Sequence, residues 1–111
     1  MSIFKGYEVK VLRLLAASVL SPWQIEALVH EGQLVRYDYT GNGYFLFVSH
    51  ESLPTERIVC SEPIVTGSVD GITCGFIIFI ENGQLMIECH SWGEVEVPIG
   101  FREMNVQITT T

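Results

Sequence analysis

The sequence is short of positive charge. It contains 6 Lys and Arg residues against 13 Asp and Glu, which gives a formal net charge of −7. None of the basic residues lies between Arg57 and Arg102, a window that holds Glu62, Asp70, Glu81, Glu88, Glu94 and Glu96. Phosphate backbones and anionic lipid repel such a chain, so nucleic acid and membrane surfaces are disfavoured partners. A charged partner of this half is expected to be basic.

Disulfide patterns and long apolar runs are also lacking. The three cysteines, Cys60, Cys74 and Cys89, are odd in number and have no C-x-x-C spacing, which is typical of buried thiols in a reducing compartment. No stretch approaches the roughly 18 apolar residues of a membrane span, and no small-residue cleavage site follows the run LLAASVL. We therefore expect a cytoplasmic protein, folded as a single domain over residues 1–111.

Two helices are predicted near the N-terminus. Residues 7–20 carry good helix formers with a broad apolar stripe. In the following segment Ser21 is suited to be an N-cap, Pro22 to be the first helical residue, and Gln24 to complete a capping box. Gly32 is placed to end this second helix, over residues 22–31, as a left-handed C-cap.

The remaining chain has the patterning of antiparallel strands. Asn82-Gly83 between two apolar runs predicts a two-residue hairpin turn, because both central residues of such a turn need positive φ. Further strands are expected over Gln33–Tyr39, Tyr44–Val48 and Arg57–Thr66, the last interrupted at Pro63. A turn is expected over Gly67–Gly71, and a last short strand or a tail over Gly100–Thr109. The expected fold class is α+β, with two N-terminal helices packed on an antiparallel sheet of five or six strands.

The hairpin register divides its residues between two faces. Pairing outward from the turn sets Ile80 against Leu85, Ile78 against Ile87 and Phe76 against Cys89, so this face is apolar and faces the core. The opposite face of the second strand carries Gln84, Met86, Glu88, His90, Trp92, Glu94 and Glu96. We predict a binding surface here, made by Glu81, Glu88, His90, Trp92, Glu94 and Glu96, with Trp92 as aromatic anchor and an acidic rim. A plain solvated face, with Met86 and Trp92 covered by a helix or loop, is the competing interpretation.

Other chemistries have weaker support in the sequence. Cys89 and His90 are adjacent in a strand and point to opposite faces, so they cannot easily share a metal ion, and neither a metal nor a cofactor is expected. The cysteines lie in apolar strand contexts, where burial makes a thiol inert. His50 with Glu51, or Glu88 with His90, could form an acid/base pair, although neighbours of this kind are common on a surface. No catalytic residues are predicted, and an enzyme is disfavoured.

A resemblance covers about half of the chain, from Tyr39 to Pro98. The segments TGNGYF at residues 40–45 and GFIIFIENGQL at residues 75–85, followed by Trp92-Gly93-Glu94, resemble a group of small bacterial proteins of unknown function. These share a T-G-x-G-aromatic turn, a G-F-x-x-F-x-x-x-G-x-L hairpin and an aromatic-Gly-Glu segment. The resemblance implies a fold, and it implies no catalytic residue.

Three functions remain open. The profile is similar to that of bacterial immunity proteins, which implies a protein-binding domain that occludes a basic, nuclease-type toxin through Trp92 and the Glu88, Glu94 and Glu96 carboxylates. The alternative is a small-ligand-binding domain or enzyme with a pocket between helices and sheet, in which His50 or His90 is the polar group. The third is a homodimer formed through the exposed hairpin face.

Overall fold

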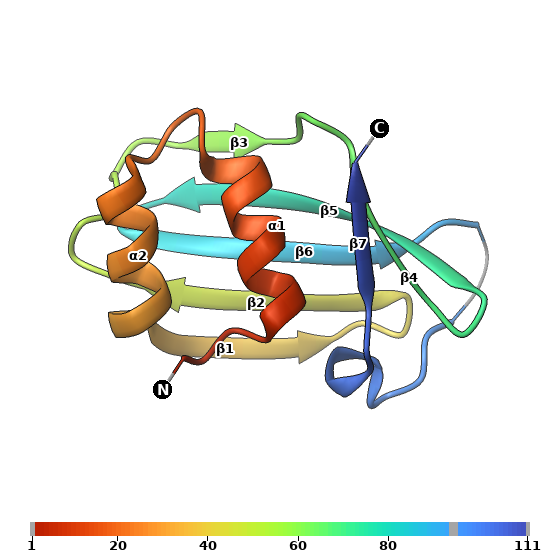
Figure 1. Cartoon of the computed structure of the whole chain (residues 1–111). Helices are drawn as coiled ribbons and strands as arrows, with labels where there is room; N and C mark the ends of the chain where they lie inside the picture. Colours follow the sequence, from red (N-terminus) through yellow and green to blue (C-terminus); the bar gives the residue numbers. More distant parts are fainter. Residues whose placement is uncertain (1, 94–95, 111) are drawn as a thin grey trace.

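The structure is a two-layer arrangement of helices on an antiparallel sheet. The computed structural model describes residues 2–93 and 96–110. Two helices, α1 (Gly6–Ala16) and α2 (Pro22–Glu31), precede all the strands and lie on one face of the sheet (Figure 1). The predicted α+β class with two N-terminal helices is confirmed.

Helix α2 begins at the predicted capping residues. The Ser21 hydroxyl accepts a hydrogen bond from the Gln24 N–H, and the Gln24 side chain accepts one from the Ser21 N–H, so α2 has the predicted capping box. Helix α1 is shorter than the predicted 7–20. The Ala16 carbonyl accepts from both the Val19 and the Leu20 N–H, which closes a turn and ends the helix.

The prediction that Gly32 is a left-handed C-cap is wrong. The residue follows α2, but its φ of −59° and ψ of 143° are not left-handed. A Cβ at this position would lie 2.5 Å from the Leu28 carbonyl oxygen and 2.9 Å from Val48 Cγ1. The glycine is therefore required by space between α2 and the sheet, and not by its backbone conformation.

Over the described part of the chain the sheet has seven strands, more than the five or six predicted. They are β1 (Gln33–Tyr39), β2 (Gly43–Ser49), β3 (Ile58–Cys60), β4 (Val65–Val69), β5 (Ile72–Glu81), β6 (Gln84–Ser91) and β7 (Gln107–Thr110). Their order is β1-β2-β6-β5-β4-β7, and β3 also pairs with β5. A short 3₁₀ helix, η1 (Phe101–Glu103), precedes β7.

One edge of β5 is shared by two strands. Strand β4 pairs with its first part, up to Gly75, and β3 pairs with its last part, from Ile78 to Ile80. The segment predicted as one strand with an interruption at Pro63 is thus two strands. The predicted turn over Gly67–Gly71 is wrong, because β4 continues to Val69 and only Asp70 and Gly71 adopt the positive φ of the turn.

The predicted register of the β5–β6 hairpin is confirmed. Ile80 pairs with Leu85, Ile78 with Ile87 and Phe76 with Cys89, and all of these side chains are buried under the helices. Strand β2 lies on the other side of β6, and its Tyr44, Leu46 and Val48 extend the same buried face.

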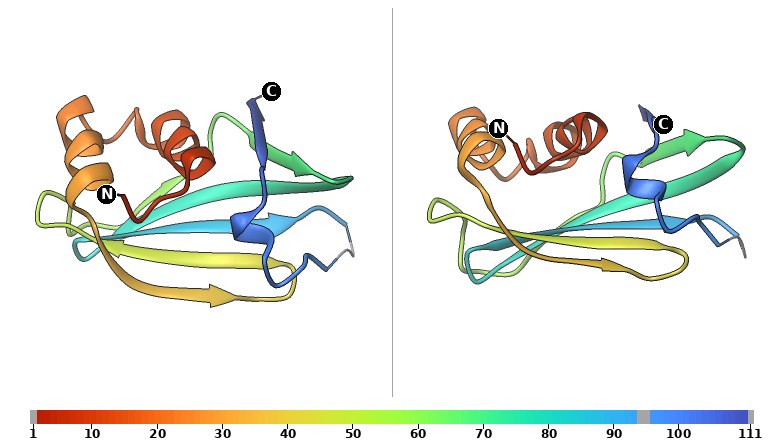
Figure 2. Two further views of the ribbon diagram at one scale, coloured as in Figure 1. Left: turned by 60° about the horizontal axis from the view of Figure 1, so that its bottom comes forward. Right: turned by 90° about the horizontal axis from the view of Figure 1, so that it is seen from below.

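No element among the described residues forms a second layer on the opposite face of the sheet. Both helices, η1 and β7 lie on one side of the central strands, as the edge-on view in Figure 2 shows. At one end of the sheet β4 and β7 curl toward this layer, so that α1 contacts β4, β5 and β7. Neither helix in the described ranges is long and apolar enough to cross a membrane.

Candidate functional site

The uncovered side of the central strands is rich in half-buried apolar side chains. We call it the outer face and define it by its residues on three neighbouring strands: Phe45 and Phe47 of β2, Met86, Glu88 and His90 of β6, and Ile77 and Phe79 of β5. The register places these side chains in rows across the sheet. Val59, Phe79, Met86 and Phe47 make one apolar row, and Ile77, Glu88 and Phe45 make the next.

Two arginines stand at the margins of the apolar row. The Arg36 guanidinium lies 4.2 Å from the Phe47 ring centroid, and that of Arg57 lies 5.9 Å from the Phe79 ring centroid. Arg36 Nε is 2.8 Å from Asp38 Oδ2, and Arg57 Nε is 3.5 Å from Glu81 Oε2. Each arginine therefore has its own carboxylate, and its charge is locally balanced.

Glu88 differs from the other charged groups of the outer face. Its cross-strand neighbours are Phe45 on one side and Ile77 on the other. The side chain is half-buried, and it has neither an ion pair nor a hydrogen bond among the residues that the structure describes. The centre of the face thus carries one unneutralised carboxylate between apolar side chains.

The structure describes four of the other residues predicted for the binding surface. His90 is exposed and pairs with Gly75, while Glu81 is exposed at the end of β5. Trp92 is 48% exposed, and its indole lies over Gly75, where an added Cβ would come within 2.6 Å of its Nε1. Glu96 is exposed beyond the end of β6, and Glu94 lies outside the described residues.

The sequence prediction missed the apolar part of this surface. Phe45, Phe47, Ile77 and Phe79 were not among the predicted site residues, although the runs YFLFV and FIIFI contain them. A continuously apolar strand is typical of sheets whose two faces are both covered. In a sheet with helices on one face only, such runs indicate an apolar surface on the other, and this signal could have found them.

A second polar arrangement is fully enclosed. Glu8 has no solvent exposure, and its two carboxylate oxygens each accept a 2.9 Å hydrogen bond from Arg102, through Nε and Nη2. The Tyr44 hydroxyl donates to Glu8 Oε2 at 2.6 Å, and the hydroxyls of Tyr44 and Tyr7 are 2.8 Å apart. Burial, and then the charge of Glu8, raises the pKa of both tyrosines. Because every group has a partner, this cluster joins α1, β2 and η1 and serves the fold.

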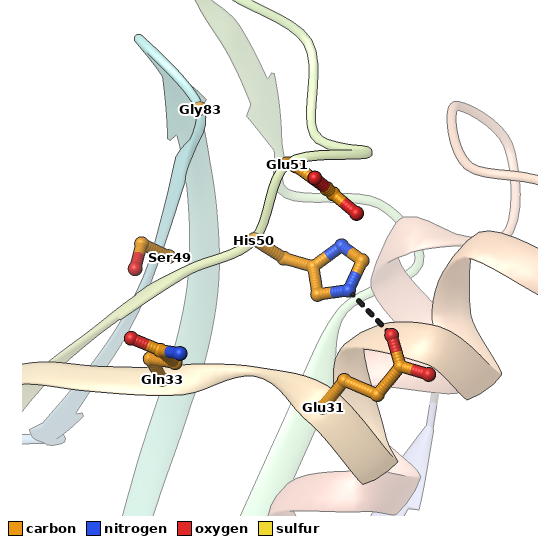
Figure 3. A pocket seen from close by; sticks show the side chains of 6 residues that line it. All are labelled: Glu31, Gln33, Ser49, His50, Glu51 and Gly83. Atoms are coloured by element: carbon orange, nitrogen blue, oxygen red, sulfur yellow. Dashed lines mark hydrogen bonds and ion pairs between the residues drawn. The ribbon is translucent and has the colours of Figure 1, made fainter.

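A pocket of about 600 Å³ lies beside His50, where the end of α2 meets the sheet. Figure 3 shows His50 Nε2 facing Glu31 Oε1, at 3.0 Å. The Ser52 N–H donates to His50 Nδ1, so Nδ1 is an acceptor and Nε2 is the ring nitrogen that donates to Glu31. The partner of His50 is thus Glu31 and not the adjacent Glu51, which the sequence had suggested.

The cysteines lie in the core. Cys60, Cys74 and Cys89 are all free and buried. Burial raises the pKa of the Cys60 thiol, and the hydrogen bond to Cys74 together with burial raises that of Cys89. Within the described ranges, no group of three His, Cys, Asp or Glu side chains is placed to hold a metal ion.

No protein-family model matches this sequence, and comparisons with curated proteins and with solved structures find no match either.

Proposed function

We propose that this chain is a cytoplasmic protein-binding domain, and that its outer face binds a basic protein. The observation that supports this most strongly is the unpaired carboxylate of Glu88 among half-buried aromatic side chains. Apolar and aromatic side chains supply most of the binding energy of protein interfaces. A docked partner would remove Glu88 from water, and a buried charge without a counter-charge is strongly unfavourable.

The charge balance of the outer face favours a cation from the partner. Arg36 and Arg57 are each matched by their own carboxylate at the margin, whereas Glu88 at the centre is not. The net charge of −7 would also steer a basic protein toward the chain and speed association.

An immunity protein is the biological role that fits this chemistry best. The basic substrate-binding surface of a nuclease-type toxin would bind the outer face, with a Lys or Arg against Glu88, and the bound chain would occlude it. The acidic composition, the similarity in profile to bacterial immunity proteins and the central Glu88 support this role.

The test begins with the products of neighbouring genes. Each is purified and titrated with the chain by isothermal calorimetry at low and at high salt. We expect one basic product to bind tightly and its affinity to fall with salt. Reversal of Glu88 to Arg should weaken binding at least tenfold, whereas Glu103→Arg, the same change at an exposed residue of η1 in the opposite layer, should not. Intact binding after the charge reversal would exclude the outer face as the site.

A second copy of the chain is the competing occupant of the outer face. Light scattering of the purified protein distinguishes the two. A stable dimer that Glu88→Arg dissociates would replace the proposal of a basic partner, and a monomer would support it.

The pocket beside His50 favours a second candidate function, the binding of a small polar ligand. Its volume of about 600 Å³ lies within the range of known ligand pockets, about 300–1,000 Å³. Thermal unfolding with a panel of small amines and sugars tests this function. A ligand that raises the melting temperature of the wild type but not of His50→Gln would support it, and a panel without any shift would count against it.

A further inference from the structure

A hollow of about 210 Å³ opens on the sheet next to Glu88. It lies where β5 lacks a strand partner on one edge, since β4 pairs as far as Gly75 and β3 begins to pair at Ile78. The connection from β3 to β4 passes this gap and contributes Ile64 to the wall. The hollow is thus a product of the strand arrangement.

Two exposed apolar side chains line this hollow. Ile64 is 55% exposed and Trp92 is 48% exposed. Ile77 and His90 also line the hollow. Gly75 lies beneath the Trp92 indole, and because it has no side chain the indole can pack against its backbone. Pockets for drug-sized ligands begin at roughly 300 Å³, so a hollow of this size is suited to a single large side chain.

The hollow and Glu88 are immediate neighbours. Ile77 is the cross-strand partner of Glu88, and directly opposed side chains have Cβ atoms about 4.5–5.5 Å apart. His90 stands two residues from Glu88 on the same face of β6, roughly 7 Å along the strand. A partner side chain in the hollow would therefore contact Ile77, and a neighbouring residue of the partner could contact the Glu88 carboxylate.

We propose that this hollow is the anchor subsite of the outer-face interface. The partner inserts one large apolar side chain (Leu, Ile, Met or Phe) between Ile64 and Trp92, and a Lys or Arg within four positions of it places its cation on Glu88. The inference rests on the proposed function and specifies what a bound segment must contain. Apolar anchors in pockets, next to a desolvated charge pair, are how interfaces concentrate binding energy.

The experiment selects peptides from a phage-displayed random library on the purified wild-type chain. Affinities of the selected peptides are then measured by fluorescence polarisation for the wild type, Glu88→Gln and Ile64→Ser. The matched controls are Glu103→Gln and Ile99→Ser, which make the same changes at exposed positions outside the hollow. Thermal unfolding verifies that each variant is folded.

We expect selected peptides to share an apolar residue within four positions of a Lys or Arg. Glu88→Gln and Ile64→Ser should each weaken the binding of these peptides about tenfold or more, and the two control variants should leave their affinity unchanged. Loss with Glu88→Gln but not with Ile64→Ser would overturn the anchor subsite and leave the outer face as a binding site. Peptides that neither variant weakens would overturn both proposals.

Discussion

Arg102 closes a bidentate ion pair on Glu8, with each nitrogen–oxygen distance 2.9 Å and the carboxylate fully shielded from solvent. The Arg102 side chain also donates to the Ile3 carbonyl at 2.7 Å. One side chain therefore neutralises a buried charge and holds η1 against the start of α1.

Removing Arg102 should destabilise the fold strongly. Arg102→Ala leaves Glu8 buried without its counter-charge, and we expect the free energy of unfolding to fall by about 3–5 kcal/mol in urea titrations. The control is Arg13→Ala. Arg13 is only 2.6 Å from Glu26, but that pair is exposed, so its loss should cost about 1 kcal/mol or less. Equal losses for the two variants would contradict the role assigned to burial.

Tyr44 should make the fold sensitive to alkaline pH. Burial, and then the charge of Glu8, raises the pKa of its hydroxyl in the folded chain. The contribution of Tyr44 to the free energy of unfolding is therefore fully present below the unfolded-state pKa of about 10. It is lost as the pH rises above that value toward the raised pKa of the folded state. We expect the free energy of unfolding, measured in urea across this pH range, to decline.

The variant Tyr44→Phe separates this effect from general alkaline denaturation. It removes the hydrogen bond to Glu8, so stability at neutral pH should fall by about 1.5–3 kcal/mol. The decline above pH 10 should then be shallower than in the wild type. An unchanged slope would show that Tyr44 does not contribute to it.

Gly32 should not tolerate a methyl group. In Gly32→Ala the new Cβ would collide with the Leu28 carbonyl and Val48, and overpacking of this kind costs about 1–3 kcal/mol. Gly6→Ala is the matched control, because a Cβ there meets nothing within 4 Å. Thermal unfolding should show a lower melting temperature for Gly32→Ala alone. A Gly32→Ala protein as stable as the wild type would contradict the close packing of α2 on the sheet.

The three thiols should be unreactive until the chain unfolds. Cys60, Cys74 and Cys89 are all buried, and a thiol reagent attacks the exposed thiolate. We expect Ellman's reagent to modify them slowly in the native protein and to modify all three rapidly in denaturant. Fast modification of any one in the native state would contradict its burial.

Much of the fold could be predicted because its signals are local. Asn82-Gly83 determines the hairpin turn, and the alternation that follows assigns Ile87 to the core and Glu88 to the opposite face. Ser21 and Gln24 likewise determine the start of α2 within a few residues. Such features need no knowledge of distant contacts.

The features that escaped prediction depend on contacts between distant residues. The lack of space for a side chain at Gly32 depends on Val48, which is distant in the sequence. The outer face is formed only when β2, β6 and β5 lie side by side. The pairing of Glu8 with Arg102 joins residues 94 positions apart, and no local pattern in the sequence indicates this pairing. For the same reason the sequence indicated His50 as a polar group but not Glu31 as its partner.

This separation also has a consequence for synthesis on the ribosome. Glu8 is synthesised 94 positions before its counter-ion Arg102. Until then, packing α1 on the growing sheet would strand a bare carboxylate in an apolar interior, which is costly. Close packing of α1 on the sheet is therefore favourable only once Arg102 has been synthesised.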